Sequence, residues 1–210
     1  IPRTAELVGA DYEEFTNVDD VVVDENTSLV VITGTTMDLE VIDVEDFKAV
    51  IAKAKEFDVP VFVDDASGAR IRCAVYDQPR AIDLGADLSV TSTDKLMEGP
   101  RGGLMAGSEK LIDEIKLVVN QYGLEAQAPL VVAMIKGIEK YSPDRIREAF
   151  KQKDELNEML ISRNLNPLKT PTGFMFKEDE IKAEFKNGIL KVTIPMIEKE
   201  EPKKKIINID

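Results

Sequence analysis

The sequence contains no histidine, and its single cysteine is Cys73. Without histidine the chain cannot build a Ser-His or Cys-His nucleophilic relay, and it lacks the commonest zinc ligand. One cysteine can form neither an internal disulfide nor a zinc cluster, so we interpret Cys73 as a structural residue. We therefore expect no metal site, and a reducing cytoplasm is the default location.

Long apolar runs and excess positive charge are also missing. No window approaches the roughly 18 apolar residues of a transmembrane helix. The opening residues, IPRTAEL, do not have the charged leader and apolar core of a signal peptide. The net charge of -13 would repel a phosphate backbone unless the basic residues were focused on one face. We therefore expect a cytoplasmic protein with no membrane partner and no nucleic-acid partner.

The 210 residues have a globular composition, 43% hydrophobic and 32% charged, which suits one α/β domain or a smaller domain with an appendage. Short runs that are apolar on both faces alternate with helical patterns, as in a parallel sheet covered by helices. Strands are predicted at residues 21–23, 28–33, 59–64, 88–92 and 104–106. The predicted fold class is therefore α/β, a three-layer sheet of mostly parallel strands with helices on both faces.

Helical spacing is clearest in residues 44–57, where acidic residues come early and lysines late, as the helix dipole prefers. The apolar positions of this segment fall on one face: Phe47, Val50, Ile51 and Ala54. Together with the flanking strands, the segment forms a strand, helix, strand unit. Further helices are predicted at residues 109–119, 126–140 and 143–160, the last with Ser142 as its N-cap.

The pattern changes after residue 164, where prolines and a glycine interrupt the helical spacing. From Ile181 the apolar residues alternate with charged ones, and Asn187-Gly188 is typical of a two-residue hairpin turn. This predicts an antiparallel hairpin rather than another parallel crossover. We place a domain boundary between residues 176 and 177.

Two segments carry candidate chemistry, and each follows a predicted strand. In VFVDDASGAR the strand ends in Asp64 and Asp65 before Ala66, and in TSTDKLMEGPRGG another strand ends in Ser92 before Lys95. Open α/β sheets bind their ligands at the carboxyl ends of parallel strands, which is where both segments fall. A lone Asp and Lys at such ends are usually solvated, so the combined pattern carries the interpretation.

Pyridoxal phosphate (PLP) chemistry needs a lysine for a Schiff base, a carboxylate for the pyridine nitrogen, a small residue against the ring and phosphate donors. In the same order, the residues that could meet these four needs are Lys95, Asp64, Ala66 and Ser92. The two segments resemble fold-type I PLP enzymes, specifically the family of bacterial selenocysteine synthase and its archaeal relatives. The lysine motif of that family stands here as Ser92, Asp94, Lys95, Leu96, Gly99, Pro100, Gly102 and Gly103.

By this resemblance Lys95 is the Schiff-base lysine, Asp64 the partner of the pyridine nitrogen, Ala66 the ring-packing residue and Ser92 a phosphate contact. Asp65 could replace Asp64, although Asp-X-Ala is the usual family spacing. Weaker candidates for anion contacts are Arg101, Thr91 and Thr93. The resemblance extends loosely over residues 1–176, which implies a partial large domain and the start of a small domain.

The resemblance also implies parts of the pocket that these segments do not supply. In this family the glycine-rich phosphate loop and the aromatic residue that stacks on the ring lie upstream. The selenocysteine-forming members also have an amino-terminal tRNA-binding region. Downstream, we expect the small domain to stop at TPTGFMFK. We therefore expect an incomplete pocket, in which PLP binding does not by itself imply turnover.

The segment after residue 176 resembles the end of a small heat-shock protein. AEFKNGILKVTIP is similar to the last hairpin of an α-crystallin domain, and Ile207-Asn208-Ile209 is similar to the carboxy-terminal Ile-X-Ile anchor of that family. The resemblance implies that the two isoleucines enter a groove of a neighbouring subunit. The simplest account is a chimera, engineered or accidental, of a PLP-enzyme segment and an α-crystallin terminus.

Two functional hypotheses follow. The first is a PLP-dependent transferase or lyase that acts on an amino-acid substrate through Lys95. The alternative is a non-enzymatic, self-assembling, chaperone-like protein in which the PLP motifs are inherited. Both predict a homo-oligomer, because an incomplete hairpin and an open pocket leave apolar edges that must be covered.

Overall fold

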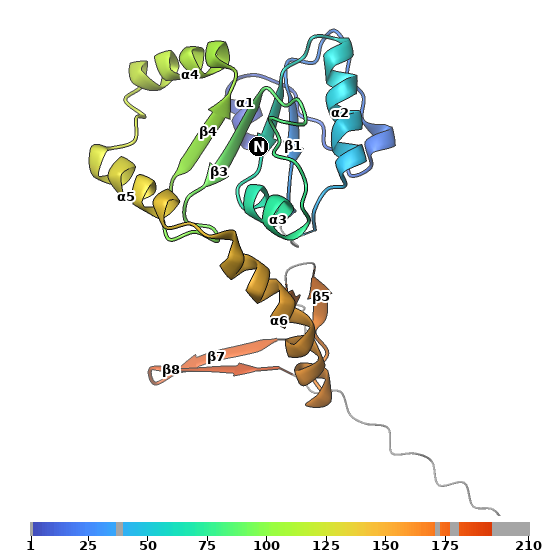
Figure 1. The fold of residues 1–210 in the computed structure, drawn as a ribbon, viewed down its shortest axis with the longest axis vertical. Helices are drawn as coiled ribbons and strands as arrows, with labels where there is room; N and C mark the ends of the chain where they lie inside the picture. Colours follow the sequence, from blue (N-terminus) through green and yellow to red (C-terminus); the bar gives the residue numbers. More distant parts are fainter. Residues whose placement is uncertain (1, 37–39, 171–172, 177–180, 195–210) are drawn as a thin grey trace, which may run out of the picture. The chain divides into compact units, whose positions relative to one another are not determined.

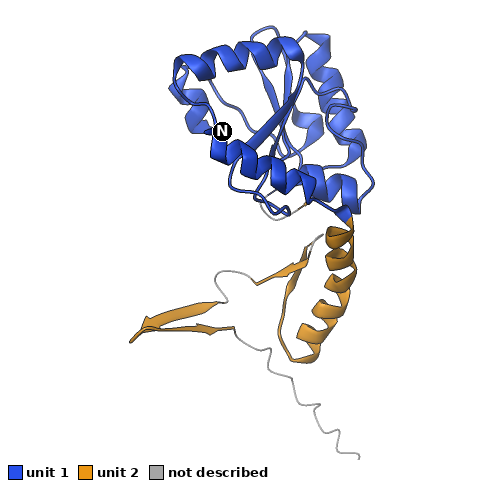
Figure 2. Ribbon diagram, turned by 60° about the vertical axis from the view of Figure 1, so that its left-hand side comes forward, with its two compact units in different colours: residues 1–37, 41–143 blue, residues 38–40, 144–210 orange. Residues whose placement is uncertain are grey.

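The structure is a computed structural model that describes residues 2–36, 40–170, 173–176 and 181–194. It divides into two compact units, Ile1–Met37 with Val41–Pro143 and Asp38–Glu40 with Asp144–Asp210 (Figure 2). The boundary expected after residue 176 separates two sequence resemblances and stays a prediction. Within the described residues, no helix has the length and apolar content needed to cross a membrane.

The first unit is built on a four-stranded sheet in the order β1-β2-β3-β4 (Figure 1). Its strands are β1 (Val30–Thr33), β2 (Val61–Asp64), β3 (Leu88–Ser92) and β4 (Gly103–Gly107). The first three strands are parallel, and β4 runs antiparallel to β3. A mostly parallel sheet with flanking helices confirms the predicted α/β fold class.

Helix α2 (Val44–Glu56) covers the buried face of β1 and β2, as predicted. It begins at Asp43, whose side chain accepts a hydrogen bond from the amide of Glu45 at 2.8 Å. Its buried positions are those expected from the spacing: Phe47, Val50, Ile51 and Ala54. They pack with Ile32, Val61 and Val63 in one core cluster, where each large apolar side chain contributes about 1.5–3 kcal/mol.

The strand predicted at residues 21–23 is wrong, because the structure has no strand there. Lys53 of α2 donates from Nζ to the carbonyl oxygens of Val18 at 2.8 Å and Val21 at 3.1 Å. A lysine therefore satisfies carbonyls that a neighbouring strand would otherwise bind. Val23 is still buried in the core, which explains its apolar character without strand pairing.

Helix α3 (Gly68–Val75) follows β2 directly and was not predicted from the sequence. Its buried positions include Arg70 and Arg72, so they do not form the apolar stripe by which a helix is predicted. The other elements of this unit are the short α1 (Pro2–Leu7), the 3-10 turn Val18–Asp20, α4 (Glu109–Gln121) and α5 (Ala128–Glu139). Of these, α4 and α5 agree with the predicted helices.

The second unit contains most of α6 (Pro143–Ser162) and two antiparallel hairpins. The hairpin of β5 (Leu168–Thr170) and β6 (Gly173–Met175) was not predicted, and it contacts α6 through a 3.4 Å bond from Asn157 Nδ2 to the Gly173 carbonyl. The predicted hairpin is confirmed as β7 (Lys182–Lys186) and β8 (Ile189–Thr193). Asn187 and Gly188 form its turn, with φ of 51° and 78°.

The β7–β8 hairpin is amphipathic. Phe185 pairs with Leu190 and Ala183 pairs with Val192, so these four apolar side chains share one face. All ten strand residues are exposed within the described structure. The Ile-X-Ile segment lies outside the described residues.

Candidate functional site

The carboxyl ends of β2 and β3 bring two of the candidate residues to one face of the sheet. Asp64 is in register with Val90 of β3, and Ser92 follows Val90 by two residues. Because side chains alternate along a strand and neighbours in register point the same way, Asp64 and Ser92 share a face. Both residues are half-buried, so both can contact a ligand at this edge.

Asp65 faces the other side of the sheet and is committed to an internal ion pair. Its carboxylate is 1% exposed and pairs with Arg72 of α3, with Nη2–Oδ2 at 2.5 Å and Nε–Oδ1 at 3.1 Å. A Cβ added to Gly34 or Gly68 would lie 2.0 Å or 2.2 Å from Asp65 Oδ1, so two glycines make room for this carboxylate. Asp64 is the neighbouring carboxylate that remains at the strand end.

Ala66 lies in the turn between β2 and α3, where its backbone joins the two strand ends. Its amide donates to Oδ1 of Asp64 at 3.2 Å. Its carbonyl accepts hydrogen bonds from the amide of Ser92 at 3.0 Å and the hydroxyl of Thr91 at 3.4 Å. These bonds fix the half-buried Ala66 beside Asp64 and Ser92.

Lys95 lies in the turn between β3 and β4, which we call the lysine turn (residues 93–102). Thr93 is fully buried and closes it: its amide donates to the carbonyl of Gly102 at 2.9 Å and its hydroxyl to the carbonyl of Pro100 at 2.6 Å. Lys95 itself is exposed. A closed turn thus carries an exposed lysine whose backbone lies near the end of β3, since Arg70 binds the carbonyls of both Lys95 and Ser92.

Helix α5 packs against the lysine turn through small residues. A Cβ added to Gly137 would lie 2.8 Å from Cα of Gly99, so the helix and the turn meet backbone to backbone. A Cβ added to Gly102 would lie 2.9 Å from Sδ of Met134. The glycines of the lysine motif therefore have a packing reason in this structure.

Arg70 of α3 is a functional candidate that the sequence reasoning missed. It is 6% exposed, and its guanidinium donates to the carbonyl oxygens of Lys95 at 2.7 Å, Ala66 at 2.9 Å and Ser92. Burial lowers the pKa of this guanidinium, against smaller opposing effects of Tyr141 and two carboxylates. The only sequence signal was two arginines close after the candidate carboxylates, in GARIR.

The weaker candidates have other roles or a looser placement. The hydroxyls of Thr91 and Thr93 donate to backbone carbonyls, so they stabilise the strand end and the lysine turn. Arg101 is exposed. Cys73 is half-buried, and burial raises the pKa of its thiol, which disfavours the reactive thiolate.

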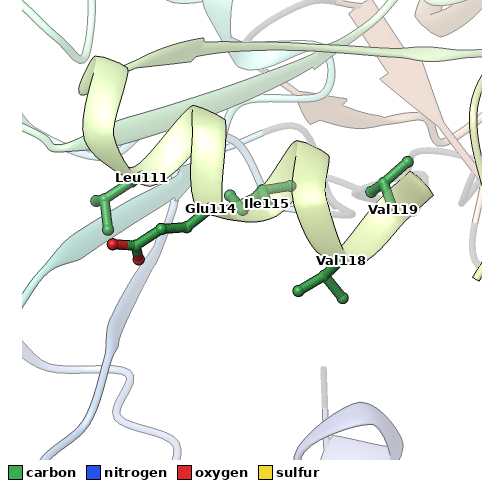
Figure 3. A pocket seen from close by; sticks show the side chains of 5 residues that line it. All are labelled: Leu111, Glu114, Ile115, Val118 and Val119. Atoms are coloured by element: carbon green, nitrogen blue, oxygen red, sulfur yellow. The ribbon is translucent and has the colours of Figure 1, made fainter. Parts of the chain in front are cut away.

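A cavity of about 290 Å³ lies along α4, and none of the candidate cofactor residues lines it (Figure 3). It is lined by five residues of that one helix: Leu111, Glu114, Ile115, Val118 and Val119. A hollow formed by successive turns of a single helix is an apolar helix surface. It brings together no amine and carboxylate pair of the kind found at the strand ends.

Solved structures of an aldolase type and of an aminotransferase share this fold. A Listeria monocytogenes protein assigned as an L-allo-threonine aldolase superposes with a TM-score of 0.64 at 20% identity, over 78% of this chain and 48% of that one. The aminotransferase AspB of Helicobacter pylori superposes with a TM-score of 0.59 at 16% identity, over 80% and 50%. The first unit thus has the fold of the fold-type I class.

The sequence profile of the L-seryl-tRNA selenium transferase family, SelA, matches residues 6–157. The chain belongs to this family. An L-seryl-tRNA(Sec) selenium transferase of Mannheimia succiniciproducens is 32% identical over 101 residues, which is 45% of this chain and 22% of that protein.

Two relatives that are more similar come from methanogens, and both are named UPF0425 pyridoxal phosphate-dependent proteins. The protein of Methanosphaera stadtmanae is 77% identical over 91% of this chain and 50% of its own length. The protein of Methanothermobacter thermautotrophicus is 49% identical over 86% of this chain and 47% of its own length. The chain therefore spans about half the length of these relatives.

A second profile, of the Hsp20/alpha crystallin family, matches residues 135–210 and confirms the resemblance of the carboxy-terminal segment. The Methanosphaera match leaves 9% of the chain uncovered, whereas residues 177–210 are 34 of 210, about 16%. Part of this segment therefore has a counterpart in the same PLP-dependent relative.

Proposed function

We propose that this chain is the lysine-bearing part of a PLP-dependent enzyme of the selenocysteine synthase-like family, a transferase or lyase that acts on an amino-acid substrate. The observation that carries the proposal is the clustering of Asp64, Ala66, Ser92 and Lys95 at the carboxyl ends of two neighbouring parallel strands. The names of the methanogen relatives support the same cofactor. The half-length match supports the further proposal that turnover needs pocket walls beyond these residues.

The donor set fits PLP. Lys95 offers an exposed primary amine, the group that attaches the cofactor's aldehyde as a Schiff base. Asp64 offers a half-buried carboxylate, while the neighbouring Asp65 is already paired with Arg72. Ala66 is small enough to lie against a flat ring, and the Ser92 hydroxyl can donate to a phosphate oxygen.

Each of these four residues then has its own role. PLP, when bound, supplies an electron sink for charge that develops on the substrate. Asp64 would keep a proton on the pyridine nitrogen, because a nearby negative charge favours the cationic form. Lys95 would attach the cofactor and, as a free amine, could carry a proton to or from the substrate. Ser92 would hold the phosphate, and Ala66 would lie against the ring.

The test is covalent trapping. Addition of PLP to the purified chain should give a visible absorbance band, and borohydride followed by peptide mapping should place the label on Lys95. Lys95→Ala should lose the band, while Lys116→Ala, at an exposed lysine of α4, should keep it. A label spread evenly over surface lysines would refute the proposal.

We also propose that the chain self-associates through its carboxy-terminal segment. The observations that favour this are the Hsp20/alpha crystallin profile match and the exposed apolar face of the β7–β8 hairpin. A two-stranded hairpin is marginally stable in water by itself, so cover for that face would stabilise it.

A further inference from the structure

We propose that Arg70 is a positioning residue that sets where the Lys95 amine lies. Its role is exerted through the backbone of the lysine turn, without contact with the reacting atoms. This inference rests on the proposed cofactor role of Lys95. It adds a second, buried residue on which the site depends.

The inference is supported by three hydrogen bonds that the guanidinium of Arg70 donates to three different carbonyls. Nε donates to the carbonyl of Lys95 at 2.7 Å, and Nη2 donates to the carbonyls of Ala66 at 2.9 Å and Ser92. These three carbonyls belong to the turn after β2, the end of β3 and the lysine turn. Because the guanidinium is planar and rigid, it holds all three at fixed relative positions.

The lysine turn needs such a restraint because its backbone is strained. Leu96 has φ of 57°, in the left-handed region that a branched residue adopts at an energetic cost. The carbonyl that Arg70 binds belongs to the peptide bond between Lys95 and Leu96. A charge-assisted bond to this carbonyl anchors the backbone of Lys95, from which the side chain extends, beside the strand ends.

The contrast with Arg72 indicates that the burial of Arg70 serves the turn. Arg72 pairs with a carboxylate, as buried arginines usually do. The described hydrogen bonds of Arg70 all go to backbone carbonyls, although the residue is 6% exposed. The guanidinium of Arg70 therefore acts in this structure as a hydrogen-bond donor to three carbonyls.

The first experiment uses the full chain without cofactor and follows amide hydrogen exchange. Arg70→Gln removes the guanidinium, so the amides of Ser92 and Thr93, which donate to the carbonyls of Ala66 and Gly102, should exchange about tenfold faster, while those of α2 stay unchanged. Arg70→Lys keeps one cationic donor and should give a smaller increase. Arg80→Gln, at an exposed arginine paired with Asp83, is the matched control and should leave the turn unchanged.

The second experiment adds PLP and borohydride to the same proteins. Both Arg70 variants should trap less label on Lys95, and the loss should be greater for Gln. If the unsubstituted chain traps none on Lys95, the proposed function fails. If it traps normally and both variants equal it in trapping and exchange, the role of Arg70 is overturned and the proposed function stands. Should Arg70→Gln lose its far-ultraviolet circular dichroism, Arg70→Lys decides, and behaviour equal to the unsubstituted chain overturns the inference.

Discussion

Asp65 and Arg72 form an ion pair in which both side chains are shielded from solvent, with exposures of 1% and 0%. Arg72 also donates from Nη1 to Oε1 of Gln78 and the carbonyl of Pro79, both at 3.2 Å, and its guanidinium stacks on Phe47 at 5.0 Å. Each guanidinium nitrogen therefore has a partner, the condition under which a buried charge is tolerated. The pair ties α3 to the end of β2.

Asp65→Asn should lower the free energy of unfolding by about 3–5 kcal/mol, because it leaves the buried Arg72 without a counter-charge. Urea unfolding followed by circular dichroism measures the change. Asp83→Asn, which removes the surface pair with Arg80, is the control and should have little effect. Equal losses in the two variants would contradict a special role for the buried pair.

Asp64→Asn should leave stability nearly unchanged but alter the bound cofactor. Without the carboxylate, the pyridine nitrogen loses its stabilising negative neighbour, so its pKa falls and the protonated form disappears at lower pH. A pH titration of the visible absorbance of the PLP-loaded chain measures this shift. The assignment of Asp64 is removed if the titration midpoint stays where it was.

Gly137→Ala should destabilise the protein by about 1–3 kcal/mol, because its Cβ would lie 2.8 Å from Cα of Gly99. The sign is informative, since alanine normally stabilises a helix interior by about 1 kcal/mol relative to glycine. Ala133→Gly, at an exposed position of α5, is the control and should cost about 1 kcal/mol by propensity alone. Thermal unfolding would count against the contact if Gly137→Ala raised stability.

Alkylation of Cys73 should require a more alkaline pH in the folded chain than in the unfolded one. Burial, the largest cause, raises the pKa of this thiol, so the folded state disfavours the reactive thiolate. The stability linked to the neutral thiol is present below the unfolded pKa and is lost as pH rises through the folded one. Iodoacetamide rates across alkaline pH, with the denatured chain as control, report one site because Cys73 is the single cysteine. Coinciding midpoints would contradict this prediction.

Ile207→Ala with Ile209→Ala should reduce the mass of the assembly while far-ultraviolet circular dichroism stays nearly unchanged. Burying two isoleucines contributes about 3–6 kcal/mol before ordering costs, enough for a weak intermolecular contact. Light scattering measures the mass, and Ile206→Ala, outside the Ile-X-Ile spacing, is the control. An unchanged mass in the double variant means that this chain offers the tail no working groove.

The sheet was predictable because its strands are short runs that are apolar on both faces, and α2 because its apolar residues recur with the helical period. Helix α3 was not, since Arg70 and Arg72 occupy buried positions where a helix normally places apolar side chains. Residues 21–23 have the composition of a strand, yet a lysine of another segment satisfies the Val21 carbonyl. Such long-range polar contacts leave no periodic signal.

At the site, the sequence predicted the strand ends and left Asp64 and Asp65 as alternatives. Adjacent residues of a strand point to opposite faces of the sheet. Arg72, which pairs with Asp65, lies on a helix that the sequence did not predict. The role of Arg70 could not be predicted from the sequence for a related reason. Its described partners are backbone carbonyls, which every residue type presents equally.

The contact between Gly99 and Gly137 makes two distant positions of the gene depend on each other. A side chain at Gly137 would push α5 off the lysine turn, and a side chain at Gly99 would collide with the backbone of Thr93 inside that turn. Both positions must therefore stay without a side chain for the turn to close and the helix to pack on it. Selection that maintains Lys95 thereby also constrains Gly137, although its helix, α5, carries no candidate cofactor ligand. Across diverging descendants, both positions should remain glycine wherever Lys95 is retained.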